Sequence, residues 1–394
     1  MGWNVIRRDD VGQTRTVLIA HPSADLYGSD RVLLETIAGL TAAGLHVVLT
    51  VPHHGPLVPE AEQRGATVRL CPTPVLRKAF LSPSGLLRLA GESLASLLAS
   101  VRLVRETRPV GVYVNTITIP LWSFVASLTR TPLLVHIHEA EGTASTVVRK
   151  LLASPLFLAD SLITNSRFSV DVLASSFPRL ARKCRVVANG VAGPPSVDAA
   201  RPDISGPVRL VYVGRLSHRK GPDLVIESLA DLRSRDIDAD LQVVGAVFPG
   251  NEVYEADLRR RIDELGVGDR VHLQGFQPSV WPFIAQSDIV VVPSRVDEPF
   301  GNTAVEAMLA ARPAVVSDTS GLREASAGFG SVLRVSPDSA AGIADAVADL
   351  VASWATYREA ALADSLAAES RNGIATYRAE IVREVEALSR GKKP

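Results

Sequence analysis

Residues 208–214 read VRLVYVG, a nearly unbroken apolar run that is rich in β-branched residues and ends in glycine. A continuous run of this length, rather than an alternating one, predicts a strand buried on both faces, as in a parallel sheet. Strands that alternate with helical patterns are typical of α/β folds. The similar runs are TVLIAH (16–21), HVVLTV (46–51), VGVYVN (110–115), LLVHIH (133–138), SLITNS (161–166), DLQVVG (240–245), RVHLQG (270–275), DIVVVP (288–293) and PAVVSD (313–318).

The runs form two series, which predicts two doubly wound Rossmann-like domains facing each other across a cleft. Between the series lies VAGPPSVDAARPDISGP (191–207), whose Pro, Gly, Ser and Asp content and lack of periodicity are typical of a linker. We therefore expect an N-terminal domain at 1–195, a linker at 196–207, a C-terminal domain at 208–370 and a helical segment at 371–394. That last segment is free to pack back on the N-terminal domain.

Composition narrows the function classes. The 42 Lys and Arg balance the 42 Asp and Glu, so a nucleic-acid polymer is not an expected partner. Cys71 and Cys184 support no disulfide framework, which is typical of a cytoplasmic protein. The N-terminus has no apolar core before a cleavage site, so we expect no signal peptide. The charge-free run at 109–129 contains prolines and favours a buried strand followed by a helix over a membrane span.

The segment GRLSHRKG (214–221) follows the opening run directly. Ligands of open parallel sheets bind beyond the carboxyl ends of the strands, so residues here are candidates for a site. Gly214 lets a ligand approach the backbone, and Arg215 and Lys220 suit a diphosphate whose charge must be neutralised. The alternative is that both cations are solvated surface charges.

A second candidate segment, SRVDEPFGNTAVEAML, follows the run DIVVVP and carries two carboxylates, Glu298 and Glu306. Pro299 and Gly301 make one helix through both carboxylates unfavourable. We therefore expect Glu298 on a loop and Glu306 on the first turn of the following helix, both bordering one cavity.

The start of that helix has two interpretations. Gly301, Asn302 and Thr303 lie where free backbone N–H groups would face an anion. Alternatively, Thr303-x-x-Glu306 is a capping box that only starts the helix. The capping box leaves Glu298 unexplained.

Histidines end the run LLVHIH. His138, followed by Glu139, is placed to bond a substrate hydroxyl or a departing charge, or else is a buried histidine with satisfied hydrogen bonds. Which of His136 and His138 faces the cleft stays open. The pair also suggests a metal, but no third ligand of matching pattern is present, so we expect no metal site.

Two further segments of the N-terminal half merit interpretation. Gly28 and Ser29 open a helix after the first strand and are a plausible anion contact, without a dinucleotide pattern. The stretch LRKAFLSPSGLLRLAG (76–91) combines cations with leucines and phenylalanine. It predicts either weak contact with an anionic membrane or a helix packed on its own domain with a solvated basic side.

These segments together resemble glycosyltransferase family 4, retaining enzymes of the GT-B fold. GRLSHRKG and the Glu298-to-Glu306 spacing carry the resemblance most specifically, and NSRFSVDVLASSF (165–177) and VVANGV (186–191) are also similar to family segments. The resemblance covers most of the chain. LYGSDR in place of a double glycine departs from the family and puts the contact of Gly28 in doubt.

The resemblance implies a retaining, metal-independent glycosyltransferase that takes a nucleotide-diphosphate sugar, most simply a UDP- or GDP-sugar, as co-substrate and needs no cofactor. Its C-terminal domain would bind this donor and its N-terminal domain a sugar or lipid-linked acceptor, in the cytoplasm or at the inner membrane face. The implied catalytic residues are His138, Arg215, Lys220 and Glu298. The implied donor-binding residues are Gly28, Gly214, Arg215, Lys220, Phe276, Gln277, Glu298, Phe300, Gly301, Asn302, Thr303 and Glu306.

Within this scheme, Arg215 and Lys220 would hold the diphosphate, and Glu306 the ribose hydroxyls. The backbone around Phe276 and Gln277 would meet the base. Two rival functions remain: a sugar-nucleotide epimerase on the same fold, and a sugar-nucleotide-binding protein without catalysis.

Overall fold

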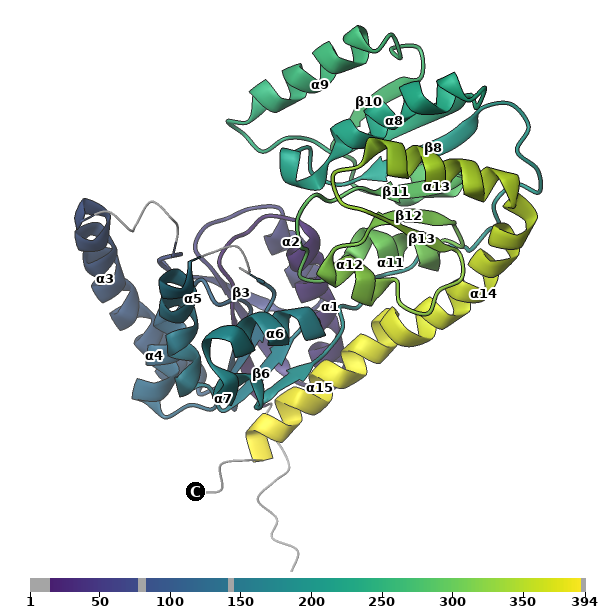
Figure 1. The fold of residues 1–394 in the computed structure, drawn as a ribbon. Coiled ribbons are helices and arrows are strands. Elements are labelled where there is room, and N and C mark those ends of the chain that lie inside the picture. The colour runs from purple at the N-terminus through teal and green to yellow at the C-terminus, as the bar shows by residue number, and fades with distance from the viewer. Residues whose placement is uncertain (1–14, 77–82, 141–144, 391–394) are drawn as a thin grey trace, which may run out of the picture. The chain divides into compact units, whose positions relative to one another are not determined.

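The computed structural model describes residues 15–76, 83–140 and 145–390. This part of the chain divides into two compact units, each built on a parallel sheet (Figure 1). The first unit takes in the described residues up to Asn165, then Ser169–Val187, and the described residues from Tyr377 onward. The second consists of Ser166–Phe168 and Ala188–Thr376, so the expected linker residues 196–207 belong to it.

The first unit contains a seven-stranded sheet in the order β3-β2-β1-β4-β5-β6-β7, with every neighbouring pair parallel. Its strands are β1 (Thr16–Ala20), β2 (His46–Val51), β3 (Thr67–Leu70), β4 (Gly111–Val114), β5 (Leu133–Ile137), β6 (Ser161–Thr164) and β7 (Cys184–Val186). Its helices are α1 (Gly28–Ala42), α2 (Leu57–Gln63), α3 (Pro83–Thr107), α4 (Leu121–Thr129), α5 (Thr146–Ala153), the 3-10 helix η2 (Ser154–Leu158), α6 (Arg167–Ser176) and α7 (Pro178–Ala181).

The second unit contains a six-stranded parallel sheet in the order β10-β9-β8-β11-β12-β13. Its strands are β8 (Val208–Val213), β9 (Ala239–Val244), β10 (Val271–Gly275), β11 (Ile289–Val292), β12 (Ala314–Ser317) and β13 (Val332–Val335). Its helices are η3 (His218–Lys220), α8 (Pro222–Ser234), α9 (Glu252–Glu264), α10 (Trp281–Gln286), α11 (Asn302–Leu309), α12 (Ser320–Ala325), α13 (Ala340–Ala352) and α14 (Trp354–Asn372); α15 (Ile374–Arg390) then returns to the first unit.

All ten apolar runs form strands, which confirms the two doubly wound domains. The sequence did not predict β3, β7 and β13, which are three of the four edge strands. Edge strands are only partly covered, and the residues of these three are mostly half-buried or exposed, so they lack a continuous apolar run. The run at 109–129 forms β4 and α4, as expected.

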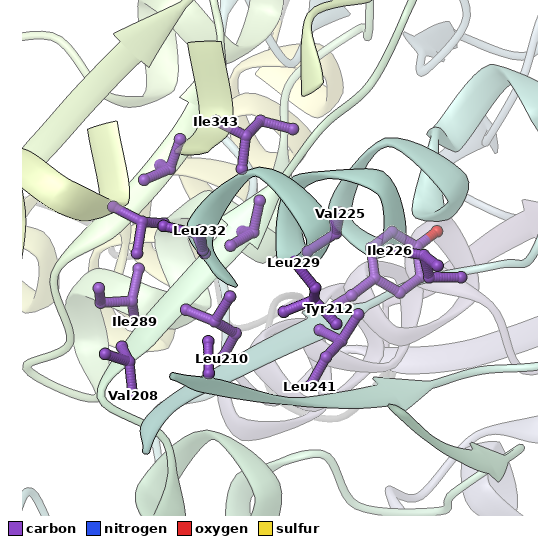
Figure 2. Packing of buried hydrophobic residues seen from close by; sticks show 14 of the residues in the cluster. Val208, Leu210, Tyr212, Val225, Ile226, Leu229, Leu232, Leu241, Ile289 and Ile343 are labelled. Carbon is purple, nitrogen blue, oxygen red and sulfur yellow. The ribbon is translucent and has the colours of Figure 1, made fainter. Parts of the chain in front are cut away.

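One hydrophobic core of the second unit lies between its sheet and α8. Leu210 and Tyr212 of β8 pack with Val225 and Leu229 of α8, and all four side chains are almost fully buried (Figure 2). This packing fixes the carboxyl end of β8, from which GRLSHRKG emerges.

No described helix is both long and apolar enough to cross a membrane. The stretch at 76–91 is only partly described: residues 77–82, which include Arg77, Lys78 and Phe80, lie outside the described residues, and α3 starts at Pro83.

Candidate functional site

The two candidate segments of the second unit begin at the same edge of its sheet. β8 and β11 are hydrogen-bonded neighbours, with Leu210 opposite Ile289 and Tyr212 opposite Val291. Because the strands are parallel, their carboxyl ends lie together, and the loops that follow can meet.

Gly221 lets these loops approach closely. It adopts a left-handed conformation with φ of +66°, and a Cβ at this position would lie 2.4 Å from the carbonyl oxygen of Pro293. The loops are also joined by hydrogen bonds, because the Arg295 N–H donates to the Arg219 carbonyl (2.9 Å) and the Arg219 guanidinium to the Asp297 carbonyl (2.9 Å).

Lys220 and Glu298 meet where the loops converge. The Lys220 Nζ donates to both carboxylate oxygens of Glu298, at 2.6 and 2.7 Å, and the Ser294 hydroxyl donates to the same carboxylate. Glu298 is 7% exposed. Burial by itself would raise the pKa of Glu298, but the charge and hydrogen bonds of Lys220, with help from Ser294, hold it below its usual value. The carboxylate therefore stays charged beside a cation.

The helix after Glu298 begins at Asn302, which corrects two expectations. Glu298 lies on a loop, as predicted, but Glu306 is the fifth residue of α11 and lies beyond its first turn. Gly301 is the N-cap, and no side chain caps the helix, so the capping box at Thr303 and Glu306 does not form. The capping box fails because the chain turns into the helix at Gly301, whose φ of +118° suits glycine.

The first turn of α11 instead has other partners. The Asn302 Oδ1 accepts a hydrogen bond from the buried Asn189 (2.9 Å), and the Thr303 hydroxyl donates weakly to the Val213 carbonyl at the end of β8 (3.4 Å). The backbone N–H groups of a helix start carry partial positive charge, which suits an anion. Phe300 is buried in a cluster with Val305, so only its backbone is available to a ligand.

Arg215 lies at the end of β8 with its guanidinium over the Phe248 ring, 3.4 Å from the ring centroid. Gly245, which follows β9, leaves room for this turn, because a Cβ on Gly245 would collide with the Gly214 carbonyl. An exposed cation stacked on an aromatic ring has a fixed direction and remains accessible.

Phe276 and Gln277 follow the edge strand β10, which is separated from β8 by β9. The Phe276 side chain is 58% exposed, and the Gln277 amide donates to the Gln274 carbonyl (2.8 Å). The two residues therefore follow the carboxyl end of a strand, as Lys220 and Glu298 do. Their strand, β10, lies two positions from β8 in the sheet.

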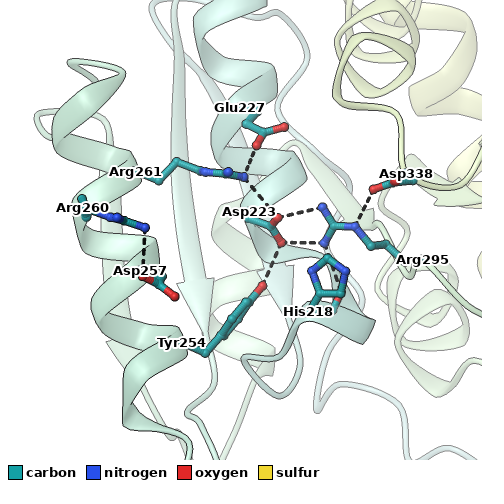
Figure 3. A network of polar contacts seen from close by, with 9 residues as sticks. All are labelled: His218, Asp223, Glu227, Tyr254, Asp257, Arg260, Arg261, Arg295 and Asp338. Carbon is teal, nitrogen blue, oxygen red and sulfur yellow. Dashed lines mark hydrogen bonds and ion pairs between the residues drawn. The ribbon is translucent and has the colours of Figure 1, made fainter.

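A polar network around Arg295 and Asp223 joins the two loops to α8 (Figure 3). Arg295 donates to both carboxylate oxygens of Asp223 (2.8 and 2.7 Å), to the His218 carbonyl (3.0 Å) and to Asp338 (2.5 Å). The Tyr254 hydroxyl also donates to Asp223 (2.8 Å). Burial would raise the pKa of Asp223, but the bonds from Arg295 and Tyr254 hold it below its usual value. One guanidinium thus joins η3, α8 and the loop after β11.

His138 lies in the first unit, directly after β5. Its Nε2 is 2.9 Å from the Asn115 Oδ1, and its ring lies 3.9 Å from the ring of His136, centroid to centroid. Burial, and then the neighbouring His21, lower the pKa of His138 to about 3. His136 is fully buried, with Nδ1 2.5 Å from the Tyr113 hydroxyl, so of the two histidines only His138 is partly accessible.

Gly28, the other expected site residue of this unit, is the exposed first residue of α1. Among the described residues, no group of three or more His, Cys, Asp or Glu side chains could hold a metal ion.

Several residues around Lys220 and Glu298, and several around His138, were not predicted from the sequence. Ser294 could have been found, because it lies in the same loop as Glu298. Asp223 and Arg295 carried no signal, because an acidic residue at a helix start and a basic residue in a loop are both ordinary. The partners of His138 were missed for the same reason, since their contacts join distant parts of the chain.

The fold and its two strand-end constellations define a GT-B type of chain. The structure of Anabaena HepE in complex with UDP matches with a TM-score of 0.79 and 21% identity, over 95% of this chain and all of that one. Sucrose-phosphate synthase from Thermosynechococcus elongatus matches with a TM-score of 0.71 and 19% identity, over 95% of this chain and 99% of that one. At such identities these likenesses show the fold alone.

Family models identify the chain further. Residues 27–190 match the model described as "Glycosyl transferase 4-like domain", and residues 199–363 match "Glycosyl transferases group 1". The chain belongs to glycosyltransferase family 4.

Curated relatives agree with this assignment. Glycogen synthase of Mycobacterium tuberculosis is 31% identical over 191 residues, 48% of this chain and 45% of the relative, so the match spans less than half of that protein. The 2-deoxystreptamine glucosyltransferase of Streptomyces kanamyceticus is 27% identical over 306 residues, 70% of this chain and 76% of the relative.

Proposed function

We propose that the protein is a retaining glycosyltransferase that moves a sugar from a nucleotide-diphosphate donor to an acceptor hydroxyl, in glycan, glycolipid or polysaccharide biosynthesis. The observation that carries this proposal is the contact of Lys220 with Glu298, at the mouth of two adjacent parallel strands. A buried carboxylate held charged beside a cation is costly, and such arrangements are concentrated at functional sites.

Charge develops on the diphosphate as the glycosidic bond breaks. Lys220 and Arg215 are the cations that would stabilise it, together with the N–H groups at the start of α11. Because the chain itself supplies this positive charge, the reaction would proceed without a divalent metal. A front-face course would let the acceptor hydroxyl enter on the side from which the diphosphate leaves, with a phosphate oxygen taking its proton.

The remaining donor contacts would come from residues that follow the carboxyl ends of strands in the same sheet. Glu298 would orient the donor sugar, and Glu306, one turn into α11, the ribose hydroxyls. The backbone at Phe276 and Gln277 would receive the base. A UDP-sugar is favoured, because HepE was solved with UDP and with UDP-glucose.

The acceptor would bind the first unit, in the cytoplasm or at the inner membrane face. A lipid-linked acceptor would fit the basic and apolar stretch at 76–91, where each cation near an anionic surface adds about 1 kcal/mol. Co-sedimentation with anionic vesicles at low and high salt tests the membrane contact. If the wild type does not bind such vesicles at low salt, the membrane contact is excluded, while the glycosyl-transfer proposal stands.

Glycosyl transfer itself is tested by incubating the protein with a panel of nucleotide sugars and acceptors and identifying the products by mass spectrometry. We expect a glycosylated acceptor and a released nucleoside diphosphate, with retained anomeric configuration and full rate in a chelator. Conversion of the donor sugar without acceptor would identify an epimerase instead. Donor binding without any turnover would identify a non-catalytic protein.

A further inference from the structure

A line of buried polar side chains joins the start of α1 to His138 in the first unit. The His21 Nε2 is 2.7 Å from Asp30 Oδ1, the His21 Nδ1 is 3.1 Å from Asn115 Nδ2, and Asn115 Oδ1 is 2.9 Å from the His138 Nε2. His21, Asp30 and Asn115 are each at most 3% exposed. The glycosyl-transfer proposal assigns no role to these three residues.

The direction of each hydrogen bond can be derived from the α1 end. The Tyr27 backbone N–H donates to Asp30 Oδ2 (2.7 Å), and a backbone N–H is always a donor. The carboxylate can only accept, so His21 must carry its proton on Nε2. Asn115 turns its amide nitrogen to the His21 Nδ1, which therefore accepts and carries no proton. This pattern of hydrogen bonds corresponds to the Nε2–H tautomer of His21.

Asn115 determines the tautomer of His138 in the same way. An amide that donates through Nδ2 presents its oxygen on the other side, and Asn115 Oδ1 faces the His138 Nε2. An oxygen can only accept, so His138 must be protonated at Nε2. Its Nδ1 then carries a lone pair, and no described residue bonds it.

We propose that Asp30, His21 and Asn115 are positioning residues that lock His138 in the Nε2–H tautomer, so that its Nδ1 acts only as a hydrogen-bond acceptor. An acceptor nitrogen binds a hydroxyl and repels a phosphate oxygen. This decides between the two roles open to a histidine at this strand end in favour of a substrate hydroxyl. That the hydroxyl belongs to a sugar rests on the proposed function; the tautomer does not.

The relay can be read without any variant, by nitrogen NMR of histidine- and asparagine-labelled protein at neutral pH. We expect the Asn115 Nδ2–H to show a scalar coupling through the hydrogen bond to the His21 Nδ1. We also expect the His138 Nε2 to be protonated and its Nδ1 not. A His138 protonated at Nδ1, or a His21 protonated at Nδ1, overturns the proposal.

Asp30→Asn reverses the relay without changing its shape. The Tyr27 N–H still requires an oxygen, so the new amide must turn its nitrogen to His21. His21 then becomes protonated at Nδ1, Asn115 flips, and His138 becomes protonated at Nδ1. Unchanged tautomers of His21 and His138 in the folded variant contradict the proposal.

Two controls separate the relay from a general effect. His136, bonded to Tyr113 and outside the relay, should keep its tautomer in Asp30→Asn. Asp25→Asn removes the same charge from an exposed position and should leave all tautomers unchanged. The NMR sample contains no nucleotide sugar and no acceptor substrate. Its result is therefore independent of whether glycosyl transfer is found.

Discussion

At the scale of single residues, the candidate donor site depends on one ion pair with a buried member. Lys220 and Glu298 are 78 positions apart, so their contact could not be predicted from spacing, although each residue was predicted to lie at a strand end. Sequence identifies such side chains because strand ends are predictable. It does not identify their pairing, because that depends on how closely two loops approach.

Removing Lys220 should destabilise the second unit in a pH-dependent way. The lowered pKa of Glu298 contributes stability that is present above its unfolded value, about pH 4, and is lost as pH falls through the folded value. Lys220→Met should therefore cost about 2–3 kcal/mol at pH 7, somewhat less than a fully buried pair, because Lys220 is partly exposed. Urea unfolding should show this cost shrinking as the pH falls below 4.

The double variant Lys220→Met/Glu298→Gln is the control, since it leaves no uncompensated charge. It should recover most of the lost stability at pH 7. A cost that stays the same from pH 7 to well below pH 4 would show that Lys220 acts through packing alone.

Arg215→Ala and Lys220→Ala should each lower turnover about a hundredfold or more, the scale for losing one preorganised charge contact. Arg235→Ala is the matched control, because Arg235 forms an exposed ion pair in the same unit. Initial rates of folded variants measure the effect. Near-normal rates for Arg215→Ala or Lys220→Ala would remove that residue from the site.

At the scale of elements, the loops after β8 and β11 are joined by hydrogen bonds and by close packing at Gly221. Sequence predicted both strands and both loops, because continuous apolar runs and glycine-rich strand ends are strong local signals. The network of Arg295 and Asp223 beneath them was not predictable, since it joins three elements through side chains that are common on surfaces.

Gly221→Ala tests the close approach of these loops. The new Cβ would meet the Pro293 carbonyl. We therefore expect a loss of folding stability greater than the cost of about 1–2 kcal/mol that alanine has in a left-handed conformation, together with reduced turnover. Gly266→Ala is the control, because Gly266 has a similar φ of +60° and open space around its Cβ. Thermal unfolding and initial rates measure both variants. Equal effects would show that the approach of Pro293 is unimportant.

Arg295→Lys tests the support beneath the loops. A lysine cannot reproduce the paired hydrogen bonds to Asp223, so Lys220 and Glu298 should lose their alignment and turnover should fall about tenfold, or about 1.4 kcal/mol. Arg261→Lys serves as the control, because Arg261 contacts Asp223 from α9 and not from the loops. Similar rates for both variants would contradict a positioning role for Arg295.

At the scale of the whole molecule, the last described helix, α15, belongs to the same unit as the first described strand, β1. Tyr377, Ile381 and Val385 of α15 are buried in the core of the first unit, and the Tyr377 hydroxyl lies 2.6 Å from Thr36. Sequence predicted the helix, because its pattern is local. The unit boundaries depend on long-range packing, and in the structure they fall at 187/188 and 376/377.

Deleting residues from Ile374 onward should therefore unfold the first unit. Four buried apolar side chains, the three above and Leu388, would be lost at about 1.5–3 kcal/mol each, which is comparable to the total stability of a domain. Hydrogen exchange should show lost protection in β1, β2 and α1, and retained protection in β8 and β11. Unchanged protection in β1 would contradict this.

The central claim is that the strand ends of β8 and β11 bind the diphosphate of a nucleotide sugar. Calorimetric titration of UDP and of GDP into the wild type, Arg215→Ala, Lys220→Ala and Arg235→Ala tests it most directly. We predict that one of the two nucleotides binds the wild type and Arg235→Ala equally, and binds Arg215→Ala and Lys220→Ala at least tenfold more weakly, a loss of about 1.4 kcal/mol or more. Equal binding by all four proteins, or no binding of either nucleotide, would contradict the claim.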